Sequence, residues 1–557
     1  MKPVTSKFKT VVLISFNDRI CLSTRVLSAH LRAAGHRPYL FFLKDDRSSA
    51  IDDFNCDAGF YQYLFNDKIM GSMGDINPAT ETEMRLLAAQ VVQIAPDVVG
   101  VSARTATCGM ARAVVQRLRR VMPQARYIGG GYGPTAEPEK FLEFLDFVCL
   151  GEGERVVADL VVAEDPTTVA NVAWIEDGRL RHNTLAPPVN LDNALWPDWS
   201  PEDKFLIEDD AVTPIAACYD TKTYDIFTTR GCPNACTYCM ASHWNRTYRH
   251  YGTRGMPGIR LRAPESVIAE LEHAKAAFGI CRVYFKDSIF GFSRKWFDRF
   301  MDLYDRRIGV PFICFLEPNF TDEARIKRLK ASGMDKTTVG IQAASESVRK
   351  TIMGRTSTDD DLVEYAGMLI RNGVGIHYDI MHWNPFDTLE TLEAGVRFLK
   401  RLPKGEDVLV SQTHIFPGSR LDGLQNARRP EPLPFDAHVY YAWLFQMILY
   451  SDETEALAEK AMGDPAFARD PSRLRDLFRS AIARMDTGFG IAASRDIEKG
   501  EMVTSVMIER FKTQKQASLA WDEKHRVLTH IARRFIPRGG LIRTEDFFGK
   551  YDYKYEG

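Results

Sequence analysis

Short apolar runs alternate with amphipathic stretches through the first 130 residues of the chain. Runs of strand length fall at residues 10–16, 37–44, 97–102 and 125–128, and helical spacing of apolar positions falls at 25–34, in the stretch that ends near 94, and at 110–121. Strands that alternate with helices in this way predict a parallel, doubly wound α/β sheet. Such sheets bind ligands at the carboxyl ends of their strands. We therefore expect a Rossmann-like binding domain over residues 1–165.

The same alternation returns in the second half of the chain. Apolar runs at residues 225–229, 282–285, 311–316, 338–342, 375–380 and 408–414 are separated by helix-length segments. Six βα units predict a partial or open (β/α)6 barrel over residues 216–425. Residues 166–215 contain several prolines and a hairpin signal at Asp177-Gly178, and we interpret them as a linker. Residues 426–557 are expected to form a mainly helical C-terminal domain.

Composition and charge limit the classes of partner. Lys and Arg number 72 against 74 Asp and Glu, a formal net charge of -2, so neither a nucleic-acid surface nor an anionic membrane partner is expected. No apolar run reaches the roughly 20 residues of a membrane span, and Asn17 cuts the first run short, so no signal peptide is expected. Most of the 10 cysteines are scattered singly, as in reduced proteins, which indicates a cytoplasmic location.

Three cysteines depart from this scatter and crowd together directly after a predicted strand. The segment reads Cys232-Pro-Asn-Ala-Cys236-Thr-Tyr-Cys239, a Cys-x3-Cys-x2-Cys spacing. Three thiolates on one tight loop can hold three irons of a cubane cluster and leave the fourth iron open for a substrate or cofactor. A structural zinc site is the alternative, with His243 as the nearest candidate fourth ligand, although zinc sites favour paired Cys-x2-Cys spacing.

This motif, preceded by Arg230-Gly231 and with Tyr238 before its last cysteine, resembles the radical S-adenosylmethionine (SAM) superfamily. The resemblance implies a [4Fe–4S] cluster on Cys232, Cys236 and Cys239, whose open iron binds the amino and carboxylate groups of SAM. One electron from the reduced cluster would then cleave SAM into methionine and a 5′-deoxyadenosyl radical. Tyr238 would pack near the adenine.

Weaker elements of the same family pattern recur near the ends of later strands. The candidates for contacts with SAM are Asp287 (methionine amino group), Gln342 and Glu346 (ribose) and Arg355 (carboxylate). Each candidate has a structural alternative. Asp287 can be a solvated carboxylate at a strand end, Gln342 and Glu346 can cap a helix, and Arg355 can lie on the surface.

The predicted N-terminal sheet lacks a dinucleotide signature, because no glycine follows its first strand. Glycines instead follow the fourth strand, at Gly129, Gly130 and Gly131, where they can let a bulky group approach the backbone. Together with the turn Gly151-Glu152-Gly153-Glu154, they resemble the cobalamin (B12) domain of B12-dependent radical SAM proteins. The resemblance implies bound cobalamin, with the three glycines, Glu152 and Ser102 among its contacts and Ser102 at the nucleotide tail.

One departure from the wider B12 family concerns the ligand of cobalt. That family carries Asp-x-His-x-x-Gly, whose histidine binds cobalt, whereas this chain reads Asp18-Arg-Ile-Cys-Leu-Ser23. The same absence is common in the radical SAM branch. Residues 61–73 are a candidate cover for the lower face of cobalt. A degenerate sheet that no longer binds cobalamin is the alternative.

The two resemblances together imply a reaction and its partners. They imply a methyltransferase acting on an unactivated carbon or phosphorus of a small molecule, with flavodoxin or ferredoxin as the electron donor. Oxidative ring closure or rearrangement with the same cofactors remains an alternative, and so does a cobalamin or redox sensor without catalysis. Methylthiolation of RNA or protein would need a second set of cluster cysteines, whereas Cys21, Cys56 and Cys108 are widely spaced.

Several other residues near predicted strand ends can line a substrate cavity or serve packing instead. They are Tyr284, His377, Tyr378, His382 and His414. The segments Tyr378-Asp379 and Asn384-Pro-Phe-Asp387-Thr388 resemble one branch of the superfamily, and their roles stay open. No general base is assigned, because a radical held close to one C–H bond depends on positioning more than on proton transfer.

Overall fold

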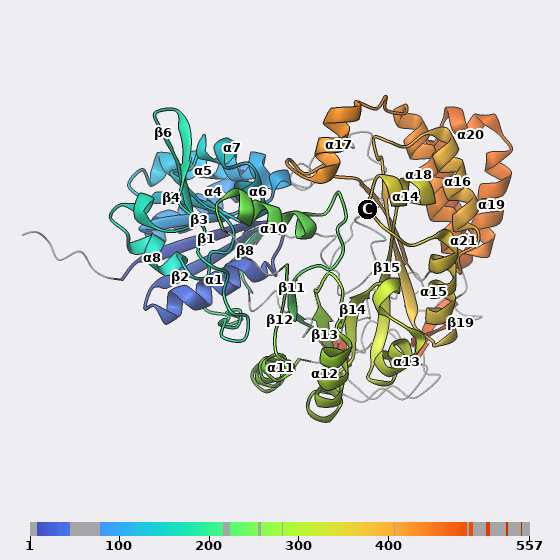
Figure 1. The fold of residues 1–557 in the computed structure, drawn as a ribbon, viewed down its shortest axis with the longest axis horizontal. Helices are drawn as coiled ribbons and strands as arrows, with labels where there is room; N and C mark the ends of the chain where they lie inside the picture. Colours follow the sequence, from blue (N-terminus) through green and yellow to red (C-terminus); the bar gives the residue numbers. More distant parts are fainter. Residues whose placement is uncertain are drawn as a thin grey trace, which may run out of the picture.

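The computed structural model describes residues 8–44, 78–215, 223–253, 258–280, 282–405 and 407–486, and four short strands farther along the chain. A nine-stranded N-terminal sheet and a six-stranded central sheet lie side by side, and a group of helices follows them (Figure 1). Residues 61–73, the candidate cover for cobalt, lie outside the described residues.

The N-terminal sheet has the strand order β7-β6-β5-β4-β3-β1-β2-β8-β9. Its parallel core consists of β1 (Thr10–Phe16), β2 (Arg37–Leu43), β3 (Val98–Ser102), β4 (Arg126–Gly130) and β5 (Phe147–Cys149). Because β1 pairs with both β2 and β3, the strand order reverses between β1 and β3. A doubly wound sheet places its ligand in the crevice at such a switch point. The predicted doubly wound sheet is confirmed.

Helices cover both faces of this sheet (Figure 1). They are α1 (Leu22–Ala33), α4 (Glu81–Ile94), α5 (Cys108–Val121), α6 (Tyr132–Ala136), α7 (Pro138–Leu142) and α8 (Val157–Val162). Successive side chains of a strand point to opposite faces, so β1 contributes to two cores. Val12 and Ile14 pack with residues of α4 and α5, whereas Val11 and Leu13 pack with residues of α1 and α8.

The segment predicted to be a linker, residues 166–215, instead extends this sheet at both edges. β6 (Val172–Glu176) and β7 (Arg179–His182) form the hairpin expected at Asp177-Gly178 and pair antiparallel with β5. At the other edge β8 (Lys204–Glu208) pairs parallel with β2, and β9 (Ala211–Pro214) pairs antiparallel with β8. β7 and β9 are short and largely exposed, so no apolar pattern predicts them.

The central sheet has six parallel strands in the order β10-β13-β14-β15-β16-β17. They are β10 (Thr223–Ile226), β13 (Arg282–Phe285), β14 (Phe312–Leu316), β15 (Met334–Gln342), β16 (Gly375–His382) and β17 (Asp407–Gln412). The connecting helices are α11 (Pro264–Phe278), α12 (Arg294–Arg307), α13 (Glu323–Ala331), α14 (Glu346–Thr351), α15 (Asp359–Arg371) and α16 (Leu389–Leu399). The terminal strands β10 and β17 do not pair with each other, so the predicted barrel is open.

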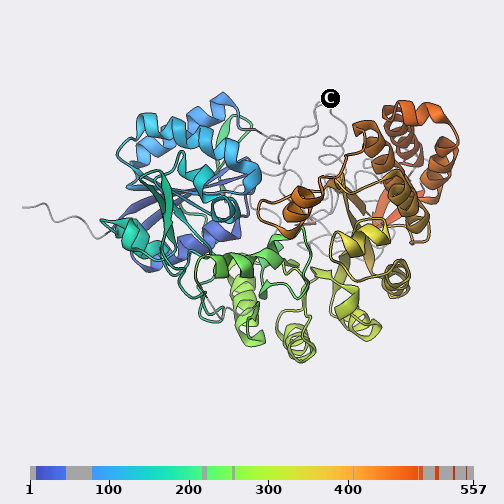
Figure 2. The same ribbon diagram turned by 45° about the horizontal axis from the view of Figure 1, so that its top comes forward.

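A short excursion after β10 connects the two sheets. It consists of β11 (Thr229–Gly231), the helix α10 (Met240–His250) and β12 (Ile259–Leu261), which pairs antiparallel with β11. Tyr248 and Tyr251 of α10 are buried in the core of the N-terminal sheet. The two sheets therefore share packed side chains, and α10 lies where they meet (Figure 2).

The predicted helical C-terminal region begins after the last barrel strand. Its helices are α17 (Arg420–Arg428), α18 (Phe435–Tyr450), α19 (Asp452–Met462), α20 (Pro465–Arg469) and α21 (Ser472–Asp486). α18 packs against β17 and α16, and its buried face belongs to the barrel core. Two small hairpins follow, β18 (Phe489–Ala493) with β19 (Ile508–Lys512) and β20 (Ile531–Ala532) with β21 (Phe547–Phe548). Within the described ranges no helix is both long and apolar enough to cross a membrane.

Candidate active site

The three clustered cysteines lie on the loop that joins β11 to α10. Cys236 is buried, Cys232 and Cys239 are partly exposed, and none of the cysteines in the described ranges forms a disulfide. Burial raises the pKa of the Cys232 thiol to about 11, and the neighbouring Cys236 and Cys239 also raise it. A bound cation would oppose both effects, because metals bind the thiolate. The three sulfurs thus form one electrostatically coupled group that suits a positively charged occupant.

The spacing of the sulfurs distinguishes a cluster from a single zinc ion. With Zn–S bonds of about 2.3 Å, the sulfurs of a tetrahedral zinc site lie about 3.8 Å apart. Among the described residues, one group of three potential ligands has all its ligand atoms within 4.8 Å, and it does not contain these cysteines. Wider spacing suits a cluster in which each thiolate binds a different iron. The loop therefore fits an iron–sulfur cluster better than zinc, and the side chain of His243 lies outside the described part of the chain.

Two distant segments hold this loop in place. Thr237 donates from its hydroxyl to the Ile352 carbonyl at 2.6 Å and from its N–H to the Met353 carbonyl at 3.0 Å, just after α14. The N–H of Leu421, at the start of α17, donates to the Thr237 carbonyl at 3.0 Å. Residues 237 and 352 are 115 positions apart, so no local pattern in the sequence predicts these contacts.

Gly231, directly before the first cysteine, fixes the start of the loop. Its φ is +101°, and a Cβ at this position would lie 2.2 Å from the carbonyl oxygen of Gly258. No other residue fits this approach of β11 to β12 without moving the backbone. The Arg-Gly pair before the motif therefore has a geometric explanation for its glycine.

The Arg355 side chain lies beside the cysteine loop and not on the surface. Its Nη1 is 3.9 Å from the Cys236 sulfur, and its Nη2 pairs with the Glu317 carboxylate. Glu317 follows β14. The sequence did not indicate it as a site residue, because it belongs to no recognisable motif. Its side chain is only 6% exposed, and its Oε1 is buried without a hydrogen-bond partner. Burial raises the pKa of Glu317, and the Arg355 charge opposes that shift.

Asp287 is fully buried at the end of β13, so the alternative of a solvated carboxylate does not apply. It accepts hydrogen bonds from the N–H and hydroxyl of Thr228, at 2.9 and 3.1 Å, and of Thr229, both at 2.6 Å. Burial raises its pKa to about 6, while these hydrogen bonds oppose the shift. Its four protein donors fasten β13 to the start of the cysteine loop and leave little acceptor capacity for the predicted SAM amino group.

Gln342 and Glu346, the two candidates for the SAM ribose, occupy different environments. Gln342 ends β15 with a φ of +67° and donates a hydrogen bond to Asp379 on β16. Burial raises the pKa of Asp379 to about 6, although Gln342 and Arg355 oppose the shift. Glu346 instead accepts from Lys350 at 2.8 Å and from the Asp359 N–H at 2.7 Å, at the start of α15. Gln342 and Arg355 thus both act on Asp379. Glu346 instead caps the start of α15, as its structural alternative predicted.

The remaining candidates divide between the barrel core and its rim. Tyr378 is buried in the barrel core and donates to the Pro403 carbonyl at 2.9 Å, so it serves packing. Tyr284 packs against Phe315 inside the barrel, with the two ring planes tilted by 34°. His414 is partly buried, and burial, together with the nearby charge of Arg104 from the N-terminal domain, lowers its pKa.

Two further candidates are His377, which is buried, and His382, which lies against His438 of α18. Tyr238 packs with Phe386 and Ile415 around a small apolar cluster behind the cysteine loop.

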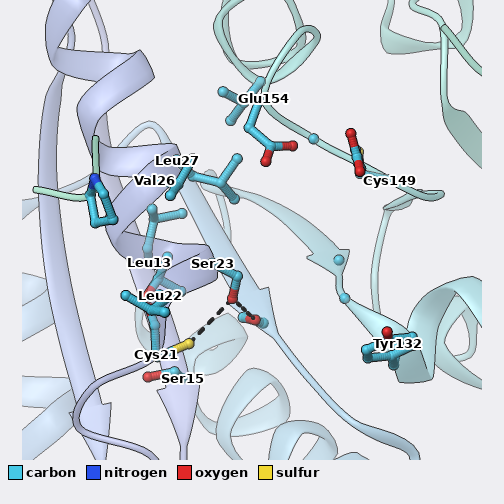
Figure 3. Close-up of a pocket in the computed structure, with 18 of the residues that line it drawn as sticks. Leu13, Ser15, Cys21, Leu22, Ser23, Val26, Leu27, Tyr132, Cys149 and Glu154 are labelled. Carbon is cyan, nitrogen blue, oxygen red and sulfur yellow. Dashed lines mark hydrogen bonds between the residues drawn. The ribbon is translucent and has the colours of Figure 1, made fainter. Parts of the chain in front are cut away.

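A cavity of about 770 Å³ opens at the switch point of the N-terminal sheet (Figure 3). It also reaches the central sheet, because Asp225 and Ile226 of β10 line it. Residues after β1 and β3 line one side, including Asp18, Ile20 and Ser102, and residues of the central domain such as Thr229 and Arg230 line the other. The cavity therefore lies between the predicted cobalamin domain and the first residues of the cysteine motif.

The predicted residues at the end of β3 and β4 line this cavity in different ways. The Ser102 hydroxyl is 3.3 Å from the Ser23 hydroxyl of α1, which in turn is 3.3 Å from the Cys21 sulfur (Figure 3). A Cβ on Gly130 would meet nothing closer than 3.9 Å, so this glycine leaves room above the backbone. A Cβ on Gly129 would lie 2.4 Å from Leu145, and Gly131 has a φ of +99°. Ser23 is a cavity residue that the sequence interpretation missed.

The turn after β1 fits a cobalamin without a histidine ligand. Ile20 stands where the wider B12 family carries its histidine, and it lines the cavity. Asp18 accepts from the N–H groups of Ile20 and Cys21, at 3.0 and 2.8 Å, and so shapes the turn. The open glycine edge and the paired serines fit a large ligand, so the degenerate-sheet alternative is not favoured.

Glu152 and Glu154, in the turn after β5, face the central domain. Glu152 forms ion pairs with Arg230, at 3.2 Å, and with Arg260, and Glu154 pairs with Arg230 at 2.6 Å. Burial raises the pKa of Glu154, but the charge and hydrogen bond of Arg230 lower it by more, so this pKa lies below its ordinary value. We call these four residues the interdomain clamp. The carboxylate of Glu152, predicted to contact cobalamin, is thus engaged by two arginines.

Two family models match this chain. The B12 binding domain matches residues 74–161, and the Radical SAM superfamily matches residues 226–399. The chain therefore matches both of the domains found in B12-dependent radical SAM proteins. The two domains imply cobalamin, SAM and a [4Fe–4S] cluster as cofactors, and the cavity and cysteine loop described above fit them.

Individual relatives of this chain are distant. An uncharacterized methyltransferase of Pyrococcus horikoshii is 25% identical over 58% of this chain and 68% of its own length. The anaerobic magnesium-protoporphyrin IX monomethyl ester cyclase of Rubrivivax gelatinosus is 24% identical over 60% of this chain and 58% of its own length. The radical SAM methyltransferase TsrM of Kitasatospora setae, solved with tryptophan substrate and a SAM analogue, matches with a TM-score of 0.53, 18% identity and 74% coverage of each chain. This last likeness establishes a shared fold.

Proposed function

We propose that this protein is a methyltransferase that transfers a methyl group to an unactivated carbon, or phosphorus, of a small organic molecule. The observation that carries the proposal is the cavity that joins the cobalamin domain to Thr229 and Arg230 at the cysteine motif. When bound, the cluster with SAM would supply a radical and cobalamin would supply the methyl group. A substrate held in this cavity would contact both sources, and relatives named methyltransferase support the assignment.

Arg355 and Glu317 are the residues we assign to the methionine end of SAM. Arg355 lies 3.9 Å from the Cys236 sulfur, so its guanidinium can pair with a carboxylate bound at the cluster. The buried, unpartnered Oε1 of Glu317 can accept a hydrogen bond from the adjacent amino group. Gln342 and Asp379, joined by a hydrogen bond on neighbouring strands, can receive the ribose hydroxyls. Asp287 keeps the loop in position and does not contact SAM in this assignment.

Ser102, Ser23 and Gly130 are the residues we assign to cobalamin. The two hydroxyls can donate to the polar tail of the ligand, and Gly130 permits its close approach to β4. The interdomain clamp holds this site against the cysteine loop. Water is excluded on one side by α10, whose Tyr248 and Tyr251 are buried at the domain boundary.

The electron donor and the cellular location are also part of the proposal. A small reducing protein such as flavodoxin or ferredoxin would deliver the electron that a radical SAM cluster needs. We place the protein in the cytoplasm, because the described cysteines form no disulfides and a reduced cluster requires a reducing compartment.

Oxidative ring closure is a second candidate function. The match to the Rubrivivax cyclase favours it, at an identity similar to that of the Pyrococcus methyltransferase. Both reactions would begin with cleavage of SAM at the cluster. They differ in that methyl transfer also consumes a second SAM, which leaves as S-adenosylhomocysteine.

The decisive experiment is product analysis of anaerobically purified protein supplied with iron, sulfide, cobalamin, SAM and dithionite, together with panels of candidate small molecules. We expect both 5′-deoxyadenosine and S-adenosylhomocysteine, quantified by mass spectrometry. The variant Cys232→Ala/Cys236→Ala/Cys239→Ala should form neither product above background. Deoxyadenosine without S-adenosylhomocysteine, in the presence of a converted substrate, would favour the cyclase function. A wild-type chain that assembles no cluster would refute both functions.

A further inference from the structure

A second group of potential metal ligands lies at the rim of the barrel and does not include the cysteines of the motif. We propose that His382, Asp387 and His438 form a binding site for one divalent transition-metal ion such as Zn²⁺. All three side chains are buried, and one ligand atom of each lies within 4.8 Å of the others. Two imidazoles and one carboxylate are a ligand set that binds zinc and other first-row divalent metals and leaves a position open. This site is additional to the cofactors of the proposed methyltransferase.

Three separate elements bring these ligands together. His382 is the last residue of β16, Asp387 lies in the turn that precedes α16, and His438 lies in the first turns of α18. In a tetrahedral zinc site with bonds of about 2.1 Å, ligand atoms lie about 3.4 Å apart. A separation within 4.8 Å therefore requires side-chain adjustments of about one ångström or less, which rotamer shifts can supply.

The orientation of His382 is set by its hydrogen bonds. Its Nε2 lies 2.9 Å from the His438 carbonyl oxygen, so this nitrogen carries the proton and donates it. Metal-binding histidines characteristically donate one ring N–H to a carbonyl and use the other nitrogen as the ligand. Thr413 also donates to the His382 carbonyl from its N–H, at 2.7 Å, and from its hydroxyl, at 2.9 Å. The backbone and ring of His382 are therefore fixed with Nδ1 left to bind.

Asp387 is a buried carboxylate with few partners. Its Oδ2 accepts from the Asn384 N–H at 3.1 Å, and no lysine, arginine or histidine of the described residues forms an ion pair with it. Burying a carboxylate without a cation is unfavourable. The same turn is stiffened by a hydrogen bond of 3.1 Å from the Phe386 N–H to the Asn384 side chain. A divalent cation between Asp387 and the two histidines would supply the missing positive charge.

His438 and its surroundings show unsatisfied polar groups and backbone strain. The Nδ1 of His438 and the Nδ2 of Asn384 are both buried without a hydrogen-bond partner. Trp383, between β16 and the turn, has a φ of +54° and stacks on the His438 ring at 5.8 Å between centroids. A bulky residue in the left-handed region is costly and is retained where surrounding contacts impose it. The strained residue thus adjoins two of the three ligands.

The site lies where it can influence the barrel rim. β16 carries Asp379, the partner of Gln342, three residues before His382, and Phe386 of the turn packs in the apolar cluster with Tyr238. A metal ion at this position would tie α18 to the end of β16 and hold the turn that adjoins the cysteine loop. The Asn384-Pro-Phe-Asp387 segment, whose role the sequence left open, would then be the connector of the site.

The test is metal binding by a chain that cannot assemble the cluster. In the full-length Cys232→Ser/Cys236→Ser/Cys239→Ser background, we expect about one Zn²⁺ per chain by equilibrium dialysis and elemental analysis. Co²⁺ should give the visible absorption of a four- or five-coordinate nitrogen and oxygen site. Asp387→Asn and His438→Gln should each weaken binding by at least about tenfold, because even loss of an outer hydrogen bond costs about 10–100-fold.

Matched control variants separate this site from surface binding. Asp360→Asn and His273→Gln change one exposed carboxylate and one exposed imidazole, and should leave binding unchanged. Asp387→Asn keeps the acceptor for the Asn384 N–H, so circular dichroism should show a folded protein. No Zn²⁺ binding by the folded background at micromolar metal would overturn the proposal. Equal binding by the Asp387 and His438 variants and by the controls would do the same. Neither result depends on catalysis, so failure here leaves the methyltransferase proposal intact.

Discussion

Arg355 illustrates how a single side chain connects several groups of the site. Its guanidinium touches the Cys236 sulfur and the Glu317 carboxylate, and its charge acts on Asp379 one strand away. The side chain is only 9% exposed, so these interactions occur with little solvent screening. Removing the charge should therefore change the electronic properties of the bound cluster as well as the local packing.

We predict that Arg355→Gln lowers the reduction potential of the reconstituted cluster. A positive charge about 4 Å from a ligand sulfur stabilises the added electron, and glutamine removes that charge. Arg355→Lys should retain most of the wild-type potential. The measurement is an anaerobic redox titration followed by electron paramagnetic resonance. Identical potentials for wild type and Arg355→Gln would show that the guanidinium does not act on the cluster.

A second prediction at this scale concerns Asp198, which accepts hydrogen bonds from Ser28 and Ser200 and pairs with Lys204 at 2.9 Å. Burial alone would raise the pKa of Asp198, but these partners hold it well below its ordinary value. Because the folded pKa lies below the unfolded one, its contribution to stability is present above about pH 4 and is lost as the pH falls below that value.

Urea unfolding at pH 7 and pH 3 tests this effect. Asp198→Asn should lower the free energy of unfolding at pH 7 by about 1–3 kcal/mol and by less at pH 3, because at pH 3 the Asp198 carboxyl of the unfolded wild-type chain is protonated and the wild type has already lost part of this contribution. An equal decrease in the free energy of unfolding at both pH values would mean that the packing of the Asp198 side chain, and not its charge, accounts for the effect. Asp177→Asn, in the exposed hairpin turn, is the control.

Among the elements, β11 and the cysteine loop depend most sharply on one residue. We predict that Gly231→Ala abolishes cluster assembly, because its Cβ would lie 2.2 Å from the Gly258 carbonyl oxygen. Gly178→Ala is the matched control, since Gly178 also has a positive φ, of +70°, but a Cβ there meets nothing within 4 Å. Both variants carry the conformational cost, and only Gly231→Ala carries the clash. Iron and sulfide content after reconstitution measures the difference, and equal loss in both variants would contradict the explanation.

The sequence predicts elements well where a continuous apolar run sets them. β1 and β13 have the predicted bounds, and the other predicted strands of the two parallel cores differ by a few residues, because parallel strands are buried on both faces. The three-residue strand β5 was not predicted. β8 and β9 were assigned to a linker, because they are short strands at and next to the sheet edge, with polar and proline residues around them. Edge pairing is decided by the neighbouring strand and leaves little trace in the local pattern.

Within the site, the cysteine spacing indicated the cluster loop, whereas long-range partners could not be predicted. Glu317 has no motif of its own and matters only because Arg355, 38 positions away, folds against it. Asp287 shows the reverse case. The pattern placed it correctly at the end of its strand, but its carboxylate accepts hydrogen bonds from Thr228 and Thr229 and not from SAM in our assignment. Residue type and position along a strand were therefore predictable, but hydrogen-bond partners were not.

At the scale of the whole molecule, the interdomain clamp is a charged contact that joins the two halves. We predict that Glu154→Gln lowers the free energy of unfolding by about 1–3 kcal/mol, because the half-buried Arg230 keeps Glu152 but loses one charged partner. The exposed Glu143→Gln, which also interrupts an ion pair with an arginine, is the control.

Limited proteolysis and urea unfolding should show the effect together. If the clamp couples the domains, Glu154→Gln should expose α10 and its flanking segments to protease earlier than the control does. Unchanged cleavage and an unchanged unfolding midpoint would show that the Glu154–Arg230 ion pair does not couple the domains.

The cavity between the domains has a consequence for how the protein matures. Its walls come from both halves of the chain, so a ligand that fills it makes more contacts in the closed arrangement than with either half alone. By mass action, such a ligand at 100 times its dissociation constant adds about 2.7 kcal/mol to the closed form. The supply of cobalamin would then affect the lifetime of the protein in the cell as well as its catalytic rate. In a cell short of cobalamin, more molecules would have their two domains separated and would be open to proteolysis.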